Sequence, residues 1–225
     1  MKEGRLFRTV IFDFDYTLAD SSRGAIKCVN QVLSDMDFPQ ASPDAVCRLI
    51  GVSLTGIFRE LTGRESAEQT QEFIRLFEHY ADQYMADLTV LFPTTAPAAR
   101  ALKRQGKNLG IVSTKFRYRI EGILKRDGLD GIFDVIVGGE DVAIHKPDPA
   151  GLLQAIRFLQ TPPEVTLYTG DSVVDAETAV RADVPFLAVL SGVTEREAFE
   201  GYPIIGAMEN LSYLPAWLKN SDHNN

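Results

Sequence analysis

The sequence predicts an α/β protein in which a parallel sheet forms the core and a wholly helical segment is inserted into it. Short runs of apolar and β-branched residues indicate the strands: Thr9–Phe12, Leu109–Val112, Phe133–Val137, Val165–Tyr168 and Phe186–Leu190. From Leu109 onward these runs alternate with helical patterns, which is typical of βαβ units with parallel strands. A chain of 225 residues can bury one large domain or two modest ones.

Glycine and proline mark the ends of the core helices. A helix is expected over Ala98–Gln105, and another over Tyr118–Asp127, where Gly128 suits the left-handed position that follows many helices. Asp148 followed by Pro149 predicts the N-cap and the first residue of a further helix. We therefore expect a structural role for Asp148.

The segment between the first two strands has helical periodicity throughout. Residues at helical spacing mark its first and last helices: Ile26, Val29, Leu33 and Met36, then Phe73, Phe77, Tyr80 and Tyr84. Between them, Ser42-Pro43 opens a helix that is expected to end at Gly51. An all-helical insert in an α/β pattern is best explained as a second, capping domain.

The predicted domain limits follow from this insert. We expect the α/β core to comprise residues 1–20 and 89–225, and the helical cap to comprise residues 21–88. The connections between the two are expected near Asp20–Ser22 and Thr89–Pro93.

Composition and charge exclude several classes of function. Lys and Arg total 23 against 31 Asp and Glu, a net charge of −8, which argues against nucleic acid or an anionic membrane as the main partner. The two cysteines, Cys28 and Cys47, fall in helical segments without CxxC spacing, so we expect buried thiols and no disulfide. No apolar run reaches the ~18 residues of a membrane span. These observations predict a cytoplasmic protein.

The first strand leads into Asp13 and Asp15, two carboxylates spaced two residues apart. Because a strand alternates its side chains between faces, both are expected to point the same way. Two close anions repel each other, so the pair favours a site for a hard metal ion at the carboxyl end of a buried strand. The alternative is a strand that runs out into a solvated acidic turn.

Polar side chains also follow the later strands. Ser113 and Thr114 come directly after the second strand, and Lys146 lies just before a predicted helix. The fourth strand leads to Asp171, and Asp175 lies one helical turn beyond it.

In this order, the segments around Asp13, Ser113, Lys146 and Asp171 resemble the four motifs of the haloacid dehalogenase superfamily, whose members are mostly magnesium-dependent phosphatases. The resemblance covers nearly the whole chain. Superfamily members with a helical cap insert it directly after the first motif, where the helical segment of this chain starts. Within that branch, the chain is most similar to phosphoglycolate phosphatase and to its pyrophosphatase and β-phosphoglucomutase relatives. The resemblance implies a Rossmann-like core with strands in the order 3-2-1-4-5.

The resemblance also implies roles for the acidic residues. Asp13 would be the nucleophile that forms an aspartyl-phosphate, and Asp15 the general acid and base. Mg²⁺ would be held by Asp13, Asp171 and the main-chain carbonyl of Asp15. Asp175 would hold water or Lys146, although Ser172-x-x-Asp175 fits a helix capping box almost as well.

Phosphate and leaving group are expected to meet different segments. Ser113, Thr114 and Lys146 would bind the phosphate. In the cap, the segment 51–59 would face the site and select the leaving group, with Ser53 and Arg59 as candidates for specificity.

The chain departs from the family pattern at two positions. Tyr16 stands where many relatives have glycine after the second aspartate, which affects the local turn and places a ring at the boundary between cap and core. Thr114 stands where relatives similar to phosphoglycolate phosphatase often have asparagine. The identity of the substrate therefore cannot be carried over.

These observations favour a Mg²⁺-dependent phosphatase, monomeric or homodimeric, that acts on a small phosphorylated metabolite such as a phosphoglycolate-like compound or a sugar phosphate. The nearest alternative is a phosphosugar mutase that uses the same residues. A non-catalytic protein that binds a phosphorylated ligand on the same fold is an alternative of another class. A nicotinamide-dependent dehydrogenase is disfavoured because no GxGxxG follows the first strand.

Overall fold

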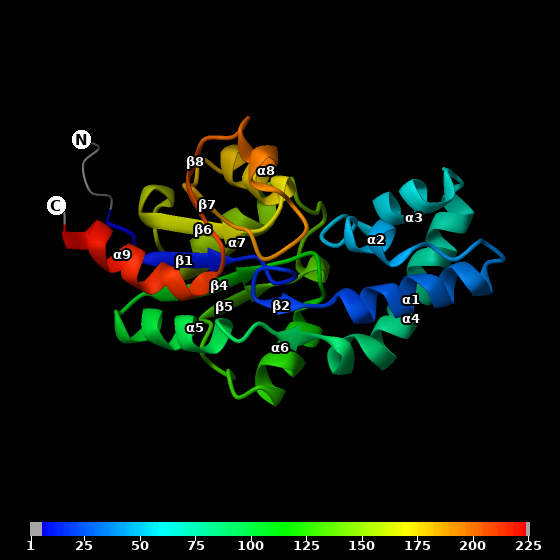
Figure 1. The fold of residues 1–225 in the computed structure, drawn as a ribbon, viewed down its shortest axis with the longest axis horizontal. Helices are drawn as coiled ribbons and strands as arrows, with labels where there is room; N and C mark the ends of the chain where they lie inside the picture. The colour runs from blue at the N-terminus through cyan, green and yellow to red at the C-terminus, as the bar shows by residue number, and fades with distance from the viewer. Residues whose placement is uncertain (1–5, 224–225) are drawn as a thin grey trace.

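The computed structural model describes residues 6–223 and contains a six-stranded parallel sheet with helices on both faces (Figure 1). Its strands are β1 Thr9–Phe12, β4 Asn108–Val112, β5 Val135–Val137, β6 Thr166–Gly170, β7 Phe186–Val189 and β8 Ile204–Met208. They lie in the order β5-β4-β1-β6-β7-β8. The predicted fold class and the order of the predicted strands are confirmed, and β8 adds an edge strand that we did not predict.

The central strand β1 is buried on both faces, which explains its continuous apolar run. Val10 and Phe12 pack into one hydrophobic cluster and Ile11 into another, because side chains alternate along a strand. The first cluster is covered by α5 Thr95–Arg104, α6 Arg117–Arg126 and α9 Leu214–His223. The second is covered by α7 Ala150–Leu159 and α8 Val173–Arg181.

The helical insert leaves the core through β2 Ala19–Asp20 and returns through β3 Val90–Leu91, which pair antiparallel. Its helices are α1 Ser22–Asp35, α2 Pro43–Cys47, α3 Leu54–Thr62 and α4 Ala67–Leu88. They pack around a hydrophobic cluster of their own and lie beyond one end of the sheet (Figure 1).

The pairing of β2 with β3 falls where the two connections between core and insert were expected. The domain limits themselves, with a core of residues 1–20 and 89–225 and a cap of residues 21–88, stay a prediction. Residues 1–5 and 224–225 of the predicted core lie outside the described residues.

Some element boundaries differ from the prediction. Helix α2 ends at Cys47 instead of Gly51, which lies in the following turn with a φ of +93°. Helix α7 begins at Ala150 with Pro149 at the N-cap, one residue later than expected. The Asp148 carboxylate nevertheless accepts a hydrogen bond from the N–H of Ala150 at 2.9 Å, so its role at the helix start is structural.

Short 3₁₀ turns complete the chain, at Gly139–Asp141, Pro163–Val165, Arg196–Phe199 and Leu211–Tyr213. Cys28 and Cys47 are free thiols, the first buried and the second half-buried. Within residues 6–223, every helix is too short or too polar to cross a membrane.

We predict that Phe58→Ala destabilises the protein far more than Phe158→Ala. Phe58 is fully buried against the rings of Phe38 and Phe73 in the insert, whereas Phe158 is 66% exposed on α7. Truncation of a buried phenylalanine costs about 3–5 kcal/mol, and truncation of an exposed one about 0.5 kcal/mol or less. Urea unfolding followed by circular dichroism measures both variants, and equal losses would contradict a packed core in the insert.

Candidate active site

The candidate site lies at the carboxyl edge of the sheet, where the ends of three neighbouring strands meet. β1 pairs with β4 on one side and with β6 on the other. Asp13 therefore lies between Ser113, which follows β4, and Asp171, which follows β6. The N–H of Asp13 donates to the carbonyl of Thr169 at 2.9 Å, which continues the β1–β6 ladder by one residue.

A buried ammonium group joins two carboxylates at this edge. Lys146 Nζ donates to Asp13 Oδ1 at 2.8 Å and to Asp175 Oδ1 at 2.7 Å. The side chains of Lys146 and Asp13 are each 5% exposed, and that of Asp175 is fully buried. Burial alone would lower the pKa of Lys146, but the charges of Asp13 and Asp175 raise that pKa well above its usual value. Lys146 is therefore a permanent positive charge beside Asp13.

Asp175 combines the two roles that the sequence left open. Its Oδ1 also accepts a hydrogen bond from the hydroxyl of Tyr168 at 2.8 Å. Its Oδ2 accepts from Ser172 Oγ at 2.6 Å and from the N–H of Ser172 at 3.2 Å. The Ser172 hydroxyl in turn accepts from the N–H of Asp175 at 3.2 Å, which completes a capping box at the start of α8. The capping box thus orients the carboxylate that holds Lys146.

Asp13, Asp171 and Asp175 form a group of buried carboxylates whose ligand oxygens lie within 4.8 Å of one another. Burial and the charges of neighbouring aspartates raise the pKa of Asp171 well above its usual value. The same two causes raise the pKa of Asp13 to about 7. This excess of negative charge fits a hard cation with oxygen ligands. Asp175 is already held by Lys146, Tyr168 and Ser172, so Asp13 and Asp171 are the two members of this group that could hold a cation.

The Asp15 carboxylate is held by different partners from that of Asp13. Its Oδ1 accepts from Ser21 Oγ at 2.6 Å and forms an ion pair with Lys115 Nζ at 3.2 Å. Because β1 ends at Phe12, strand alternation does not extend to Asp13 and Asp15, and the expectation that the two side chains point the same way stays a prediction.

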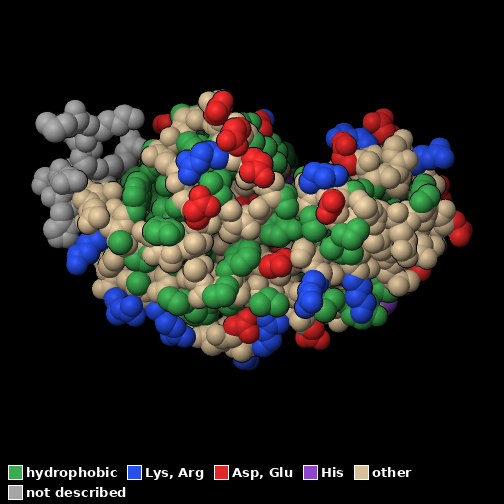
Figure 2. Space-filling model, in the orientation of Figure 1, with side chains coloured by type: hydrophobic (Ala, Val, Ile, Leu, Met, Phe, Trp, Pro, Cys, Tyr) green, Lys and Arg blue, Asp and Glu red, His purple; other side chains and the backbone are tan. Residues whose placement is uncertain are grey.

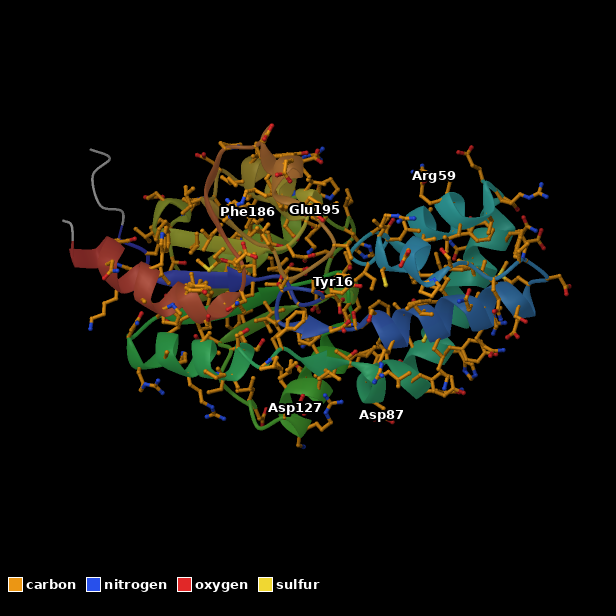
Figure 3. All side chains as sticks on the ribbon, in the orientation of Figure 1. Tyr16, Arg59, Asp87, Asp127, Phe186 and Glu195 are labelled. Carbon is orange, nitrogen blue, oxygen red and sulfur yellow. The ribbon has the colours of Figure 1, made fainter. Side chains whose placement is uncertain are left out.

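Tyr16 follows directly, at the boundary between core and insert (Figure 3). Its φ of +60° is rare for a residue with a side chain and is readily adopted by glycine. Ser191 Oγ donates to its carbonyl at 2.6 Å, and its ring is 8% exposed. Burial and a hydrogen bond with the side chain of Cys47 raise the pKa of Tyr16, so the phenol stays neutral and links the core to α2.

The hydroxyl-bearing residues after β4 differ in exposure. Ser113 is buried, and its Oγ accepts a hydrogen bond from the N–H of Lys115 at 3.2 Å. Thr114 is half-buried and lines a cavity between core and insert.

This cavity has a volume of about 350 Å³ and lies between core and insert. The molecular surface is indented between these two parts in the view of Figure 2. Asp15 and Lys115 line it from the core, and Ser53 lines it from the insert, where its hydroxyl also caps α3. Arg59 does not line it. Its side chain is 59% exposed, pairs with Glu60 at 3.6 Å and lies on the outer side of the insert (Figure 3). The expectation that Arg59 faces the site is therefore wrong, because α3 turns that position toward solvent.

Comparison with known proteins identifies the family of the chain. The family model for haloacid dehalogenase-like hydrolases matches residues 10–189. The chain belongs to this family. It is 31% identical over 206 residues to pyrophosphatase PpaX of Bacillus mycoides, covering 90% of this chain and 94% of the relative. It is 30% identical over 185 residues to the phosphoglycolate phosphatase of Aquifex aeolicus, covering 82% and 85%.

A solved structure from Bacteroides fragilis, described as a haloacid dehalogenase-like hydrolase, has a TM-score of 0.90 at 46% identity and covers 92% of this chain and 99% of that one. The chain is thus an enzyme of the hydrolase class with the haloacid dehalogenase-like fold.

Three residues of this haloacid dehalogenase-like hydrolase were missed by the sequence analysis. Lys115, which pairs with Asp15, directly follows Ser113 and Thr114, so its position after a strand was a usable signal. Arg119 is buried on α6, where its guanidinium pairs with Asp82 of α4 at 2.7 Å. Gly192 packs against Asp171, and nothing in its local sequence indicates that contact.

We predict that Gly192→Ala impairs the hydrolase through Asp171. A Cβ at position 192 would lie 2.0 Å from Asp171 Oδ2 and 3.1 Å from Tyr16 Cβ, so the carboxylate must move. Mutation of a group that orients a metal ligand typically costs about 10- to 100-fold in metal affinity or activity, and we expect a loss of this size if Asp171 is such a ligand. Phosphatase assays across a MgCl₂ titration test this. Gly201→Ala is the matched control, because its Cβ would meet nothing within 4 Å. Equal activity of the two variants would contradict the prediction.

Proposed function

We propose that the protein is a Mg²⁺-dependent phosphatase that hydrolyses a small phosphorylated metabolite through an aspartyl-phosphate. The observation that carries this proposal is the placement of the Asp13 carboxylate against the Lys146 ammonium at 2.8 Å, with Asp171 alongside. The names of the relatives support a phosphorylated substrate, since one is a pyrophosphatase and another a phosphoglycolate phosphatase.

In the first step, an oxygen of Asp13 attacks phosphorus, and the bond between phosphorus and the ester oxygen breaks. Lys146 holds Oδ1 of Asp13 and supplies a positive charge close to the incoming phosphoryl group. The repulsion between an anionic nucleophile and an anionic phosphate is thereby reduced. The buried Ser113 hydroxyl, at the end of the neighbouring strand, is positioned to bind a phosphate oxygen together with Thr114.

We assign the exchange of protons to Asp15. It lines the cavity, and Ser21 and Lys115 hold its Oδ1 in place. In the first step it gives a proton to the departing alkoxide. In the second it takes a proton from the water that attacks phosphorus, the bond between phosphorus and Asp13 breaks, and inorganic phosphate leaves.

Asp13 and Asp171 are the residues that would hold Mg²⁺, with the carbonyl of Asp15 as a further candidate. When bound, the ion neutralises charge on the phosphoryl oxygens and on the buried carboxylates. Asp175 acts through Lys146, which it holds at 2.7 Å.

We predict that Asp13→Asn abolishes the hydrolysis of an aryl phosphate. The amide keeps the shape of the side chain but removes the nucleophilic charge, so activity should fall about 10³-fold or more. Release of inorganic phosphate measures turnover, and circular dichroism verifies folding. Asp37→Asn, an exposed position in the insert, is the matched control and should keep full activity. A fully active Asp13→Asn variant would exclude the aspartyl-phosphate. If the unsubstituted protein instead isomerises a sugar phosphate without releasing phosphate, the mutase is favoured.

We predict that stabilisation by Mg²⁺ is greater at high pH. Folding raises the pKa of Asp13 to about 7 and also raises the pKa of Asp171. Without Mg²⁺, each carboxylate therefore destabilises the fold increasingly as the pH rises from its pKa in the unfolded chain to its pKa in the folded protein. Protons also compete with the cation for the carboxylates at low pH. The Tm increase caused by MgCl₂ should therefore be larger at about pH 8 than at about pH 5.5.

Asp171→Asn should remove most of this Mg²⁺-dependent increase in Tm. An increase that is equal at both pH values, or that survives this substitution, would place the ion elsewhere.

A further inference from the structure

We infer that the alcohol part of the substrate is a neutral, largely apolar group that fills the cavity between core and insert, an inference that rests on the proposed function. The cavity adjoins the chemistry directly, because Asp15, the group placed to protonate the leaving oxygen, forms part of its wall. Whatever is bonded to that oxygen must therefore extend into this space.

The wall that the insert contributes is mainly apolar. It is formed by side chains from α1, α2, α3 and α4 and from the segment before α3: Val29, Val46, Val52, Ile57, Phe77 and Met85. Removal of such a surface from water is favourable by about 25 cal/mol per Å², so an apolar ligand gains affinity there and a hydrated polar ligand does not.

The volume is large for a very small leaving group. At about 350 Å³ it falls within the range of roughly 300–1,000 Å³ that is usual for pockets enclosing small molecules. A two-carbon alcohol would leave most of this apolar space to water.

The charges in the wall disfavour an anionic leaving group. Arg119 is paired with Asp82 of α4, and two acidic residues, Glu78 and Glu140, also line the cavity. When Asp15 carries the proton for the leaving oxygen, it no longer balances Lys115, but the two glutamates still outnumber this one cation. A carboxylate on the leaving group would thus enter a wall of net negative charge.

A series of n-alkyl phosphates tests the inference, because the leaving alcohols differ in length but hardly in basicity. We expect kcat/KM to rise from ethyl through butyl to hexyl phosphate, by up to about fourfold per methylene, and to level off once the cavity is full. Hexyl phosphate with a terminal carboxylate should be at least about tenfold poorer than hexyl phosphate, through desolvation of the charge and repulsion.

Substitutions in the wall locate the effect. Val52→Phe should shift the preferred chain to a shorter one by filling space, and the isosteric Val52→Thr should flatten the rise by making the wall polar. Arg59→Ala is the control, since this residue lies outside the cavity, and it should leave the series unchanged.

The outcomes separate the inference from the proposed function. If ethyl phosphate is hydrolysed and kcat/KM does not rise with chain length, the inference is overturned and the phosphatase stands. A rise that is the same in both Val52 variants would also overturn it, because the chain would bind elsewhere. If no phosphate ester, including an aryl phosphate, is hydrolysed in the presence of Mg²⁺, the proposed function fails, and the inference fails with it.

Discussion

The Lys146 ammonium, which lies between the buried carboxylates of Asp13 and Asp175, is the interaction on which the carboxyl edge of the sheet depends. Further hydrogen bonds hold the two aspartates in place. Asp13 continues the β1–β6 ladder, and Asp175 is held by Tyr168 and by the capping box with Ser172. Removal of one member of such a buried set leaves an uncompensated charge, which typically costs 3–5 kcal/mol. The fold therefore presents Asp13 in one orientation, and the geometry of this carboxylate is a consequence of packing.

The same edge carries more negative charge than Lys146 can neutralise. The raised pKa values of Asp13 and Asp171 express this excess, because each carboxylate is buried near others of the same sign. A bound cation or protons must balance it, at some cost to stability when neither is present. Gly192 contributes by leaving room for Asp171, since any side chain there would collide with the carboxylate. The buried carboxylates thus lower the stability of the fold, and they create a concentration of negative charge with shifted pKa values, as is common at catalytic centres.

The insert and the core form the cavity together, and their contacts place its two walls. Arg119 of α6 lies against the rings of Phe116 and Tyr118 and donates to Asp82 and to the carbonyl of Glu78 on α4. The Arg119 guanidinium is therefore engaged in contacts that join the core to the insert. The core side of the cavity, near Asp15, is mainly polar and the insert side is mainly apolar, which is the basis for the substrate class inferred above.

The strand order was expected from the family resemblance. Local patterns in the sequence determined the parallel sheet, the position of the helical insert and the strand ends that carry Asp13, Ser113 and Asp171. These features follow from hydrophobic periodicity and from the rule that parallel strands end at one edge, so they require no knowledge of distant contacts. Only the tertiary structure decided which charges pair and which residues face the cavity. Lys115 meets Asp15, and Arg59 turns to solvent, because partner choice depends on how separate elements pack, and the spacing of residues along one element does not contain that information.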